Sequence, residues 1–193
     1  SSISEHLDLH PMESNNSDVF GTNFTVSIDH KNTTTGISAN ERTLTARALI
    51  DQHAKASDFN RPGHLFPLIA KDNGVLERNG HTEAAIDLAK LTGAKPAGVI
   101  CEIMNDDGSM AKGEDLQAFK DKHQLVMITI ESLIEYRQVN ESHVKLNAKV
   151  KMPTDFGTFD MYGFTTDYSE EEIVVITKGD IRSHENVRIH SAC

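Results

Sequence analysis

The chain has 193 residues, of which 38% are hydrophobic and 25% are charged, and its formal net charge at pH 7 is −10. These values are typical of a globular protein with one domain or two small ones. The charge argues against nonspecific nucleic-acid binding, and no apolar run approaches the ~18 residues that a membrane span needs. We therefore expect a protein that binds neither nucleic acid nor membrane. Two distant cysteines, Cys101 and Cys193, form no disulfide framework, so a cytoplasmic location is expected.

The first third of the chain is predicted to contain two helices and one strand. A short helix is expected within Ser1–Leu9, and the polar residues 11–18 are expected to form a surface loop. Residues 20–29 alternate between apolar and polar side chains, which predicts a half-buried strand. Ser38 and Glu41 form a capping box, and its helix is expected to run to about residue 53.

Three threonines, including Thr34 and Thr35, precede Gly36 in the polar connection before this second helix. On such a loop the hydroxyl groups can bond the backbone of their own turn. That interpretation needs no ligand, and the loop by itself does not require one.

Two stretches place a histidine directly after a glycine, with an arginine close by. Residues 60–66 contain His64 and are predicted to be a loop that leads into a short strand at Leu68 and Ile69. Residues 78–83 contain His81 and precede a periodic apolar run, so a helix is expected to start there, with Thr82 as N-cap.

The helix start at residues 78–83 is a candidate anion site. Glu83 lies in the first turn, where a carboxylate suits the helix dipole, and the free N–H groups together with Arg78 favour a phosphate. A histidine beside them suggests a metal or a proton transfer. Simpler interpretations are that Gly63 makes a turn that His64 caps, and that His81 is an exposed helix-start residue.

Residues 97–103 are predicted to be a buried strand that contains Glu102. A buried glutamate without a partner is costly, so Glu102 is expected to face a cation, a donor or a pocket, unless it belongs to a strand edge. Gly93 is expected to end the helix before this strand. The acidic residues 105–108 do not match the spacing of a calcium loop and are predicted to be a solvated turn.

Three further elements are expected before residue 140. They are a helix over Gly113–His123 with Leu116, Ala118 and Phe119 facing inward, an apolar strand over 125–130, and a helix over Glu131–Arg137. This alternation of helices and strands predicts an α/β or α+β architecture, a sheet covered by helices. The pattern leaves open whether the sheet is parallel or mixed.

The composition changes at residue 140. Residues 140–151 are expected to be a polar linker that passes into a new strand, and residues 151–159 and 173–181 suggest a β-rich segment. We therefore expect one domain over 1–139 and the start of a second domain over 140–193.

Five ordered stretches up to about Arg137 closely resemble the 3,4-dihydroxy-2-butanone 4-phosphate synthase family. They are Gly21–Val26, Thr34–Ala39, Ser57–His64, Gly80–Ala84 and Gly98–Gly108. The resemblance implies an α+β fold with a mixed sheet covered by helices, and a homodimer with active sites at the subunit interface. It also implies conversion of ribulose 5-phosphate to a four-carbon riboflavin precursor and formate, with Mg²⁺ or Mn²⁺.

The same resemblance implies roles for particular residues. His64 and Glu102 match the positions that are essential for catalysis, and His81 matches a metal ligand. Substrate contacts are implied at Thr34, Thr35, Arg78, Asn79, Gly80, His81, Thr82 and Glu102. The family also carries an acidic loop that binds metal and substrate, and this loop has no counterpart in the chain. We therefore expect the chain to be part of a longer enzyme and to be inactive or severely impaired by itself.

The last 50 or so residues resemble the start of GTP cyclohydrolase II, which is often fused to the synthase in this order. By resemblance, Arg188, Ile189, His190 and Ser191 help hold GTP, and Cys193 is the first of three cysteines that bind Zn²⁺. Ala192 stands where that family has a glutamate, which puts this contact in doubt. The alternative to an enzyme is a non-catalytic module that binds a phosphosugar or nucleotide.

Overall fold

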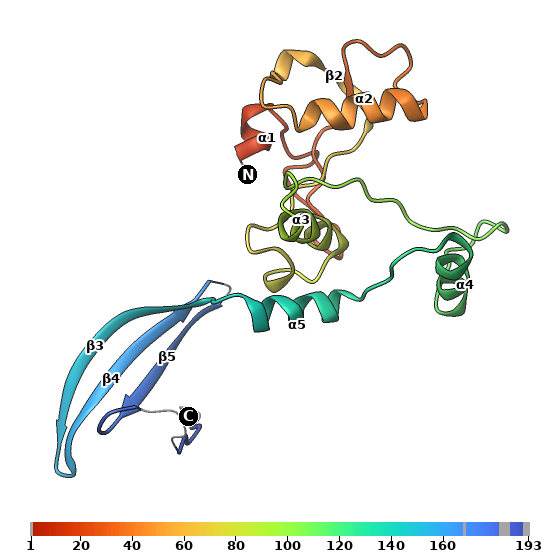
Figure 1. The fold of residues 1–193 in the computed structure, drawn as a ribbon. Coiled ribbons are helices and arrows are strands. Elements are labelled where there is room, and N and C mark those ends of the chain that lie inside the picture. The colour runs from red at the N-terminus through yellow and green to blue at the C-terminus, as the bar shows by residue number, and fades with distance from the viewer. Residues whose placement is uncertain (1, 168, 182–185, 191–193) are drawn as a thin grey trace. The chain divides into compact units, whose positions relative to one another are not determined.

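A computed structural model describes residues 2–167, 169–181 and 186–190 of the chain. It divides into two compact units, 1–137 and 138–193. The helices and strands in chain order are α1 Ser2–His6, β1 Ile28–His30, α2 Ala39–Leu49, β2 Phe59–Leu65, α3 His81–Leu91, α4 Glu114–His123, α5 Ile130–Asn140, β3 Val144–Thr154, β4 Gly157–Thr166 and β5 Ser169–Thr177 (Figure 1). Two short 3₁₀ turns, η1 Ala56–Asp58 and η2 Gly74–Leu76, precede β2 and α3.

The core of the first unit lies around the antiparallel pair of β1 and β2. Five apolar side chains form it, and they come from the N-terminal segment, β1, β2 and the connection after α2; they are Leu7, Leu9, Ile28, Ala54 and Phe59. The α2 helix is fixed to this pair through buried Thr45, whose hydroxyl accepts from the backbone N–H of His30 at 3.0 Å. The core and this hydrogen bond therefore hold β1, β2 and α2 together.

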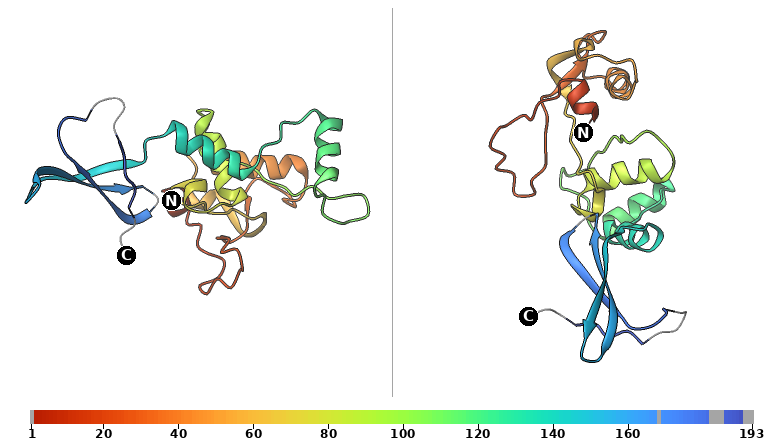
Figure 2. Two further views of the ribbon diagram at one scale, coloured as in Figure 1. Left: turned by 90° about the horizontal axis from the view of Figure 1, so that it is seen from below. Right: turned by 90° about the vertical axis from the view of Figure 1, so that its left-hand side faces the viewer.

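The second unit contains a three-stranded antiparallel sheet with the strand order β3-β4-β5. The three strands lie side by side in Figures 1 and 2. The hairpin between β3 and β4 turns at Asp155 and Phe156, and β4 begins at Gly157, whose φ of +108° favours glycine. The predicted β-rich segment is thus confirmed, and its first strand begins at Val144, inside the predicted linker.

Several predicted elements are present with shifted ends. Ser38 caps α2 as expected, because its hydroxyl accepts from the Glu41 N–H at 3.3 Å. The helix ends at Leu49, four residues early, where the Asp51 side chain accepts from the backbone N–H of His53 and offers a competing turn. The α3 helix begins at His81 with Gly80 as its N-cap, so the predicted N-cap at Thr82 is wrong. Gly93 follows α3 with a φ of +73°, as expected of a C-terminal glycine.

The alternation over residues 20–29 predicted a longer strand than the structure contains. Only Ile28–His30 is a strand, and Phe24 is exposed whereas Thr25 is fully buried. The Thr25 hydroxyl donates to the Pro67 carbonyl at 3.0 Å, which allows a polar side chain to be buried. Residues 60–66, predicted as a loop, lie largely within strand β2.

Two predicted strands are absent from the described residues. Neither 97–103 nor 125–129 has regular structure, and Ile130 opens α5. A strand needs a neighbour for its N–H and C=O groups, and no described strand pairs with either segment. Val99 is 77% exposed and Val126 is 92% exposed. The α4 helix likewise has no buried residue, so the expected inward face of Leu116, Ala118 and Phe119 is wrong.

Candidate functional site

His64 is held by a buried aspartate that sequence reasoning did not single out. Asp29 accepts twice from His64, from Nδ1 at 2.7 Å and from the backbone N–H at 3.0 Å. The Asp29 side chain is 11% exposed and that of His64 is 47% exposed. The Nδ1 edge of the imidazole is therefore fixed against the buried carboxylate, while about half of the side chain is exposed to solvent.

An irregularity between β1 and β2 makes this contact possible. Ile28 pairs with Leu65 while Asp29 pairs with Asn60, so residues 61–64 have no partner on β1. Extra residues of this kind bend a strand and redirect its side chains. Gly63 is needed in the bend, because a Cβ there would lie 2.0 Å from the Ile28 carbonyl carbon.

The threonine loop, residues 34–36, surrounds a carboxylate of its own chain. Glu41 accepts from the hydroxyls of Thr34 at 2.8 Å and Thr35 at 3.1 Å, and from the N–H of Gly36 at 3.1 Å. Hydrogen bonds from the Thr34 backbone and hydroxyl, followed by those from Thr35 and Ser38, lower the pKa of Glu41 to about 2. Both threonines are exposed, so the loop remains open to a ligand.

Arg78 forms a buried ion pair at the start of α3. Its Nη1 donates to Glu83 at 2.6 Å, and the Glu83 side chain is only 1% exposed. The other Glu83 oxygen accepts from the Lys71 backbone N–H at 3.1 Å. Arg78 also donates to the Phe20 carbonyl from Nε at 3.1 Å and from Nη2 at 3.0 Å, and to the Thr22 hydroxyl at 3.3 Å.

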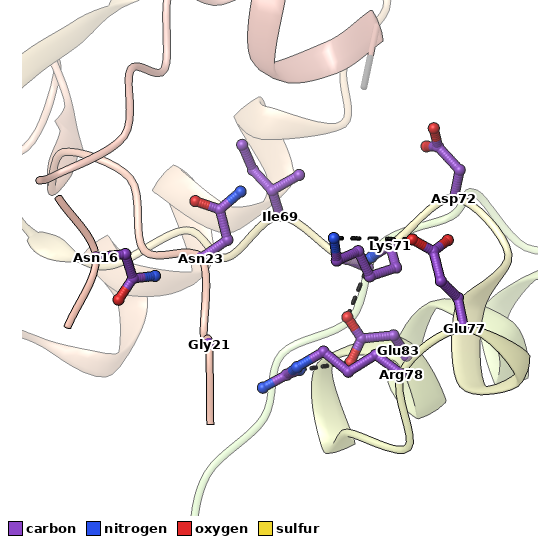
Figure 3. A pocket seen from close by; sticks show the side chains of 10 residues that line it. Asn16, Gly21, Asn23, Ile69, Lys71, Asp72, Glu77, Arg78 and Glu83 are labelled. Carbon is purple, nitrogen blue, oxygen red and sulfur yellow. Dashed lines mark hydrogen bonds and ion pairs between the residues drawn. The ribbon is translucent and has the colours of Figure 1, made fainter. Parts of the chain in front are cut away.

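A cavity of about 300 Å³ opens beside this pair (Figure 3). Figure 3 shows Arg78 and Glu83 at its wall, with Lys71 and Glu77 nearby. Of the site residues predicted from the sequence, Arg78 alone belongs to the described lining. Two cationic and three acidic side chains line it, namely Lys71, Arg78, Asp72, Glu77 and Glu83. The cavity as described is therefore mixed in charge.

A second buried acid on α3 ties the helices together. Asp87 is 2% exposed at its side chain and pairs with Arg137 of α5 at 2.9 Å. It also accepts from the Val75 backbone N–H at 2.8 Å. Together with the bond from Arg137 to the Asn73 carbonyl at 2.8 Å, this pair joins α3, α5 and the segment before η2.

The structure leaves other predicted site residues apart. Glu102 is exposed on coil, which corrects the prediction that it is buried. His81 and Asn79 are exposed, and Gly80 and Thr82 are half-buried. Within the described ranges, no three His, Cys, Asp or Glu side chains gather as a metal site would require.

The predicted GTP and zinc residues fall partly outside the described structure. Arg188, Ile189 and His190 lie on exposed coil. Ser191, Ala192 and Cys193 are outside the described residues. Cys101 is a free, exposed thiol.

Sequence reasoning missed the partners of the site residues. Asp29 was the last residue of the alternating stretch 20–29 and carried no motif, although an acid at the end of a half-buried strand was a usable signal. Glu83 was placed correctly in the first turn but was expected to serve the helix dipole, whereas it pairs with Arg78. The Asp29–His64 contact joins segments 35 positions apart, whereas Arg78 and Glu83 lie only five positions apart within one motif.

Comparison with known proteins places both parts of the chain in families. Residues 1–136 match the profile of 3,4-dihydroxy-2-butanone 4-phosphate synthase. The chain belongs to this family. Residues 145–193 match GTP cyclohydrolase II, so both resemblances drawn from the motifs are confirmed.

Two curated relatives are named as riboflavin biosynthesis proteins. The chain is 73% identical over 192 residues to the riboflavin biosynthesis protein RibBA of Staphylococcus epidermidis, and 74% identical over 191 residues to that of Staphylococcus aureus. It spans about half the length of these curated relatives, 49% of each.

Solved structures of the synthase share the fold. A two-domain synthase from A. baumannii superposes with a TM-score of 0.80 at 40% identity, covering 92% of this chain and 53% of that one. A synthase in complex with two magnesium ions gives 0.65 at 37% identity, covering 72% of this chain and 70% of that one. The predicted α+β synthase fold is thereby confirmed. No helix in the described ranges has both the length and the apolar character that a membrane crossing demands.

Proposed function

We propose that this chain is part of a bifunctional enzyme of riboflavin biosynthesis. Its synthase domain, assigned to residues 1–139, converts D-ribulose 5-phosphate to 3,4-dihydroxy-2-butanone 4-phosphate and formate. The domain that starts at residue 140 belongs to a GTP cyclohydrolase II, which converts GTP to a diaminopyrimidinone ribosyl phosphate, formate and diphosphate. The observation that carries this proposal is the match to both families, in this order, along one chain. The resemblance to the synthase supports a homodimer, and the two distant cysteines support a cytoplasmic location.

Proton transfer is the proposed role of His64 and Glu102. Formation of an enediol from a ketose phosphate requires removal of a carbon-bound proton, and a positioned imidazole is well suited to that step. The His64 ring is anchored through Nδ1, and its side chain is still half-exposed. Glu102 is exposed on a segment without regular structure, so its role here rests on the motif it shares with the family.

Substrate binding is the proposed role of the helix start and the threonine loop. Arg78 has five N–H donors, and four hydrogen bonds to its own chain leave one for a phosphate. Asn79, Gly80, His81 and Thr82 lie at the N-terminus of α3, where an anion is favoured, although the Gly80 N–H already donates to the Arg78 carbonyl at 2.8 Å. Thr34 and Thr35 present hydroxyls that can leave Glu41 for a substrate oxygen.

The described residues do not by themselves fit a magnesium centre. Mg²⁺ takes about six oxygen ligands, and no cluster of three candidate ligands occurs in the described ranges. His81 offers one nitrogen, and the nearby Glu83 is engaged by Arg78 and Lys71. We propose His81 as one ligand of a site that needs further donors, and we derive no catalytic step through a metal. A zinc site at Cys193 equally needs further ligands, because zinc is usually bound by three or four protein groups.

Formate release tests the proposed function. We would assay the full-length protein with ribulose 5-phosphate and magnesium, alongside the 193-residue chain, which we expect to be inactive. His64→Ala and Glu102→Ala should each lower kcat by about 10²- to 10⁴-fold, the range for loss of a general acid or base. His53→Ala is the matched control, since His53 is an exposed histidine whose ring hydrogen-bonds its neighbour Gln52 at 3.1 Å.

The outcomes separate enzyme from binding module. A full-length protein that binds the sugar phosphate in the presence of magnesium without releasing formate would favour the non-catalytic module. A His64→Ala variant that reacts as fast as the unsubstituted enzyme would remove His64 from the proton-transfer role.

A further inference from the structure

Asp29 is buried at the point where three segments of the first unit meet. It lies on β1, opposite the unpaired residues 61–64 of β2, and against Gly36 of the threonine loop. A buried carboxylate is costly unless donors satisfy it, and both described donors to Asp29 come from one residue, His64. Burial of this charge is therefore coupled to the placement of one imidazole.

The contact determines which ring nitrogen carries the proton. An ionised carboxylate only accepts hydrogen bonds, so the Nδ1 atom 2.7 Å from Asp29 must be the donor. In a neutral imidazole with Nδ1 protonated, Nε2 carries a free lone pair. Within the part of the chain that the structure describes, Nε2 has no hydrogen-bond partner, and the side chain is 47% exposed.

The surroundings of Asp29 hold it in this position. Its second oxygen, Oδ1, accepts from the His64 backbone N–H at 3.0 Å, so rotation of the carboxylate would break two bonds. Gly36 has a φ of +74°, and a Cβ there would lie 2.2 Å from Asp29 Oδ2. The threonine loop thus packs its backbone directly against the carboxylate that orients His64.

We propose that Asp29 is a positioning residue for the synthase reaction: it holds His64 as the Nδ1–H tautomer, so that Nε2 is the nitrogen that exchanges protons with the substrate. The proposal rests on the proposed function and adds a residue and an atom to it. A carboxylate fixes a general base in the same way in other enzymes, where the asparagine replacement stabilises the wrong tautomer.

A double-mutant cycle in the full-length protein tests the proposal. Asp29→Asn should lower kcat by more than about tenfold with KM within about twofold, because the amide N–H₂ can donate to Nδ1 and move the ring proton to Nε2. In the His64→Ala background the same substitution should change kcat by less than about twofold, because Asp29 acts through His64. Asp58→Asn is the control, since Asp58 pairs with Lys31 and not with a histidine.

A residue with a merely structural role would lower kcat equally in both backgrounds, and that result would overturn the proposal. If the full-length protein releases no formate, the proposed function fails, and the tautomer is then tested directly. Histidine-selective ¹⁵N NMR of the neutral ring, with His64→Gln to assign its signals, should show Nδ1 protonated. A ring protonated at Nε2 would overturn the proposal whatever the activity.

Discussion

Two regions of the first unit differ in which side chains they bury and which they expose. Between residues 25 and 91 the protein buries polar and charged groups, with Asp29, Glu83 and Asp87 all less than 10% exposed, at 8%, 1% and 2%. Between residues 97 and 130 it exposes apolar ones, including Val99 and Val126. The first region supplies a partner for each buried charge, whereas no described strand covers the second. Burial in this unit therefore follows the available partners more closely than it follows hydrophobicity.

Breaking a buried pair should have the largest effect on stability. Glu83→Ala leaves the Arg78 guanidinium without its carboxylate and should lower the free energy of unfolding by about 3–5 kcal/mol. Urea unfolding of the chain measures this. Lys31→Ala is the control, because its pair with Asp58 is half-exposed and should contribute little. Equal losses in the two variants would contradict the distinction between buried and exposed pairs.

Alanine substitutions at two glycines with similar φ values can distinguish the cost of backbone strain from the cost of a clash with Asp29. Gly36 and Gly93 have φ values of +74° and +73°, so alanine at either position should cost about 1–2 kcal/mol. An alanine Cβ at Gly36 also meets Asp29, whereas nothing lies within 4 Å at Gly93. Gly36→Ala should therefore destabilise the chain further and lower kcat in the full-length protein. If both variants behave alike, Asp29 is not confined by the threonine loop.

Acid should loosen the threonine loop. The folded state lowers the pKa of Glu41 from 4.5 to about 2, so its bonds to Thr34 and Thr35 contribute stability above pH 4.5. That contribution is lost as the pH falls from 4.5 toward 2, because the unfolded state takes up the proton first. Amide hydrogen exchange at Thr34 and Gly36 should speed up in this window relative to Glu41→Gln, beyond the intrinsic pH effect. If the exchange rates of the unsubstituted chain and of Glu41→Gln depend on pH in the same way, the stabilising role of the Glu41 carboxylate is contradicted.

The exposed apolar segment should tolerate substitution in the chain by itself. Val126→Ser should change the free energy of unfolding by less than about 0.5 kcal/mol, because the side chain is 92% exposed. Leu133→Ala, at a buried position on α5, should cost about 2–5 kcal/mol. A large loss for Val126→Ser would show that this segment is covered in solution, for instance by a second copy of the chain.

The sequence predicted the elements whose signals are local. The Ser38 cap, the terminating Gly93 and the helix start near His81 follow from contacts within a few residues, and all three are present. The β-rich character beyond residue 140 was also recognisable, because consecutive hairpin strands pair with close neighbours in the chain. Among the candidate site residues, Arg78 and His81 were singled out from the residue pattern, and their roles stay predictions.

Tertiary structure decided which of these residues have partners. The apolar runs at 97–103 and 125–130 have the composition of strands, but a strand also needs a neighbour, which the described residues do not supply. The contact between Asp29 and His64 spans 35 positions, and the one between Asp87 and Arg137 spans 50. Local propensity fixes caps and turns because their bonds close within one turn of chain. The buried carboxylate of Asp29 depends on donors that lie 35 positions away, so only the folded chain reveals its contact with the imidazole of His64.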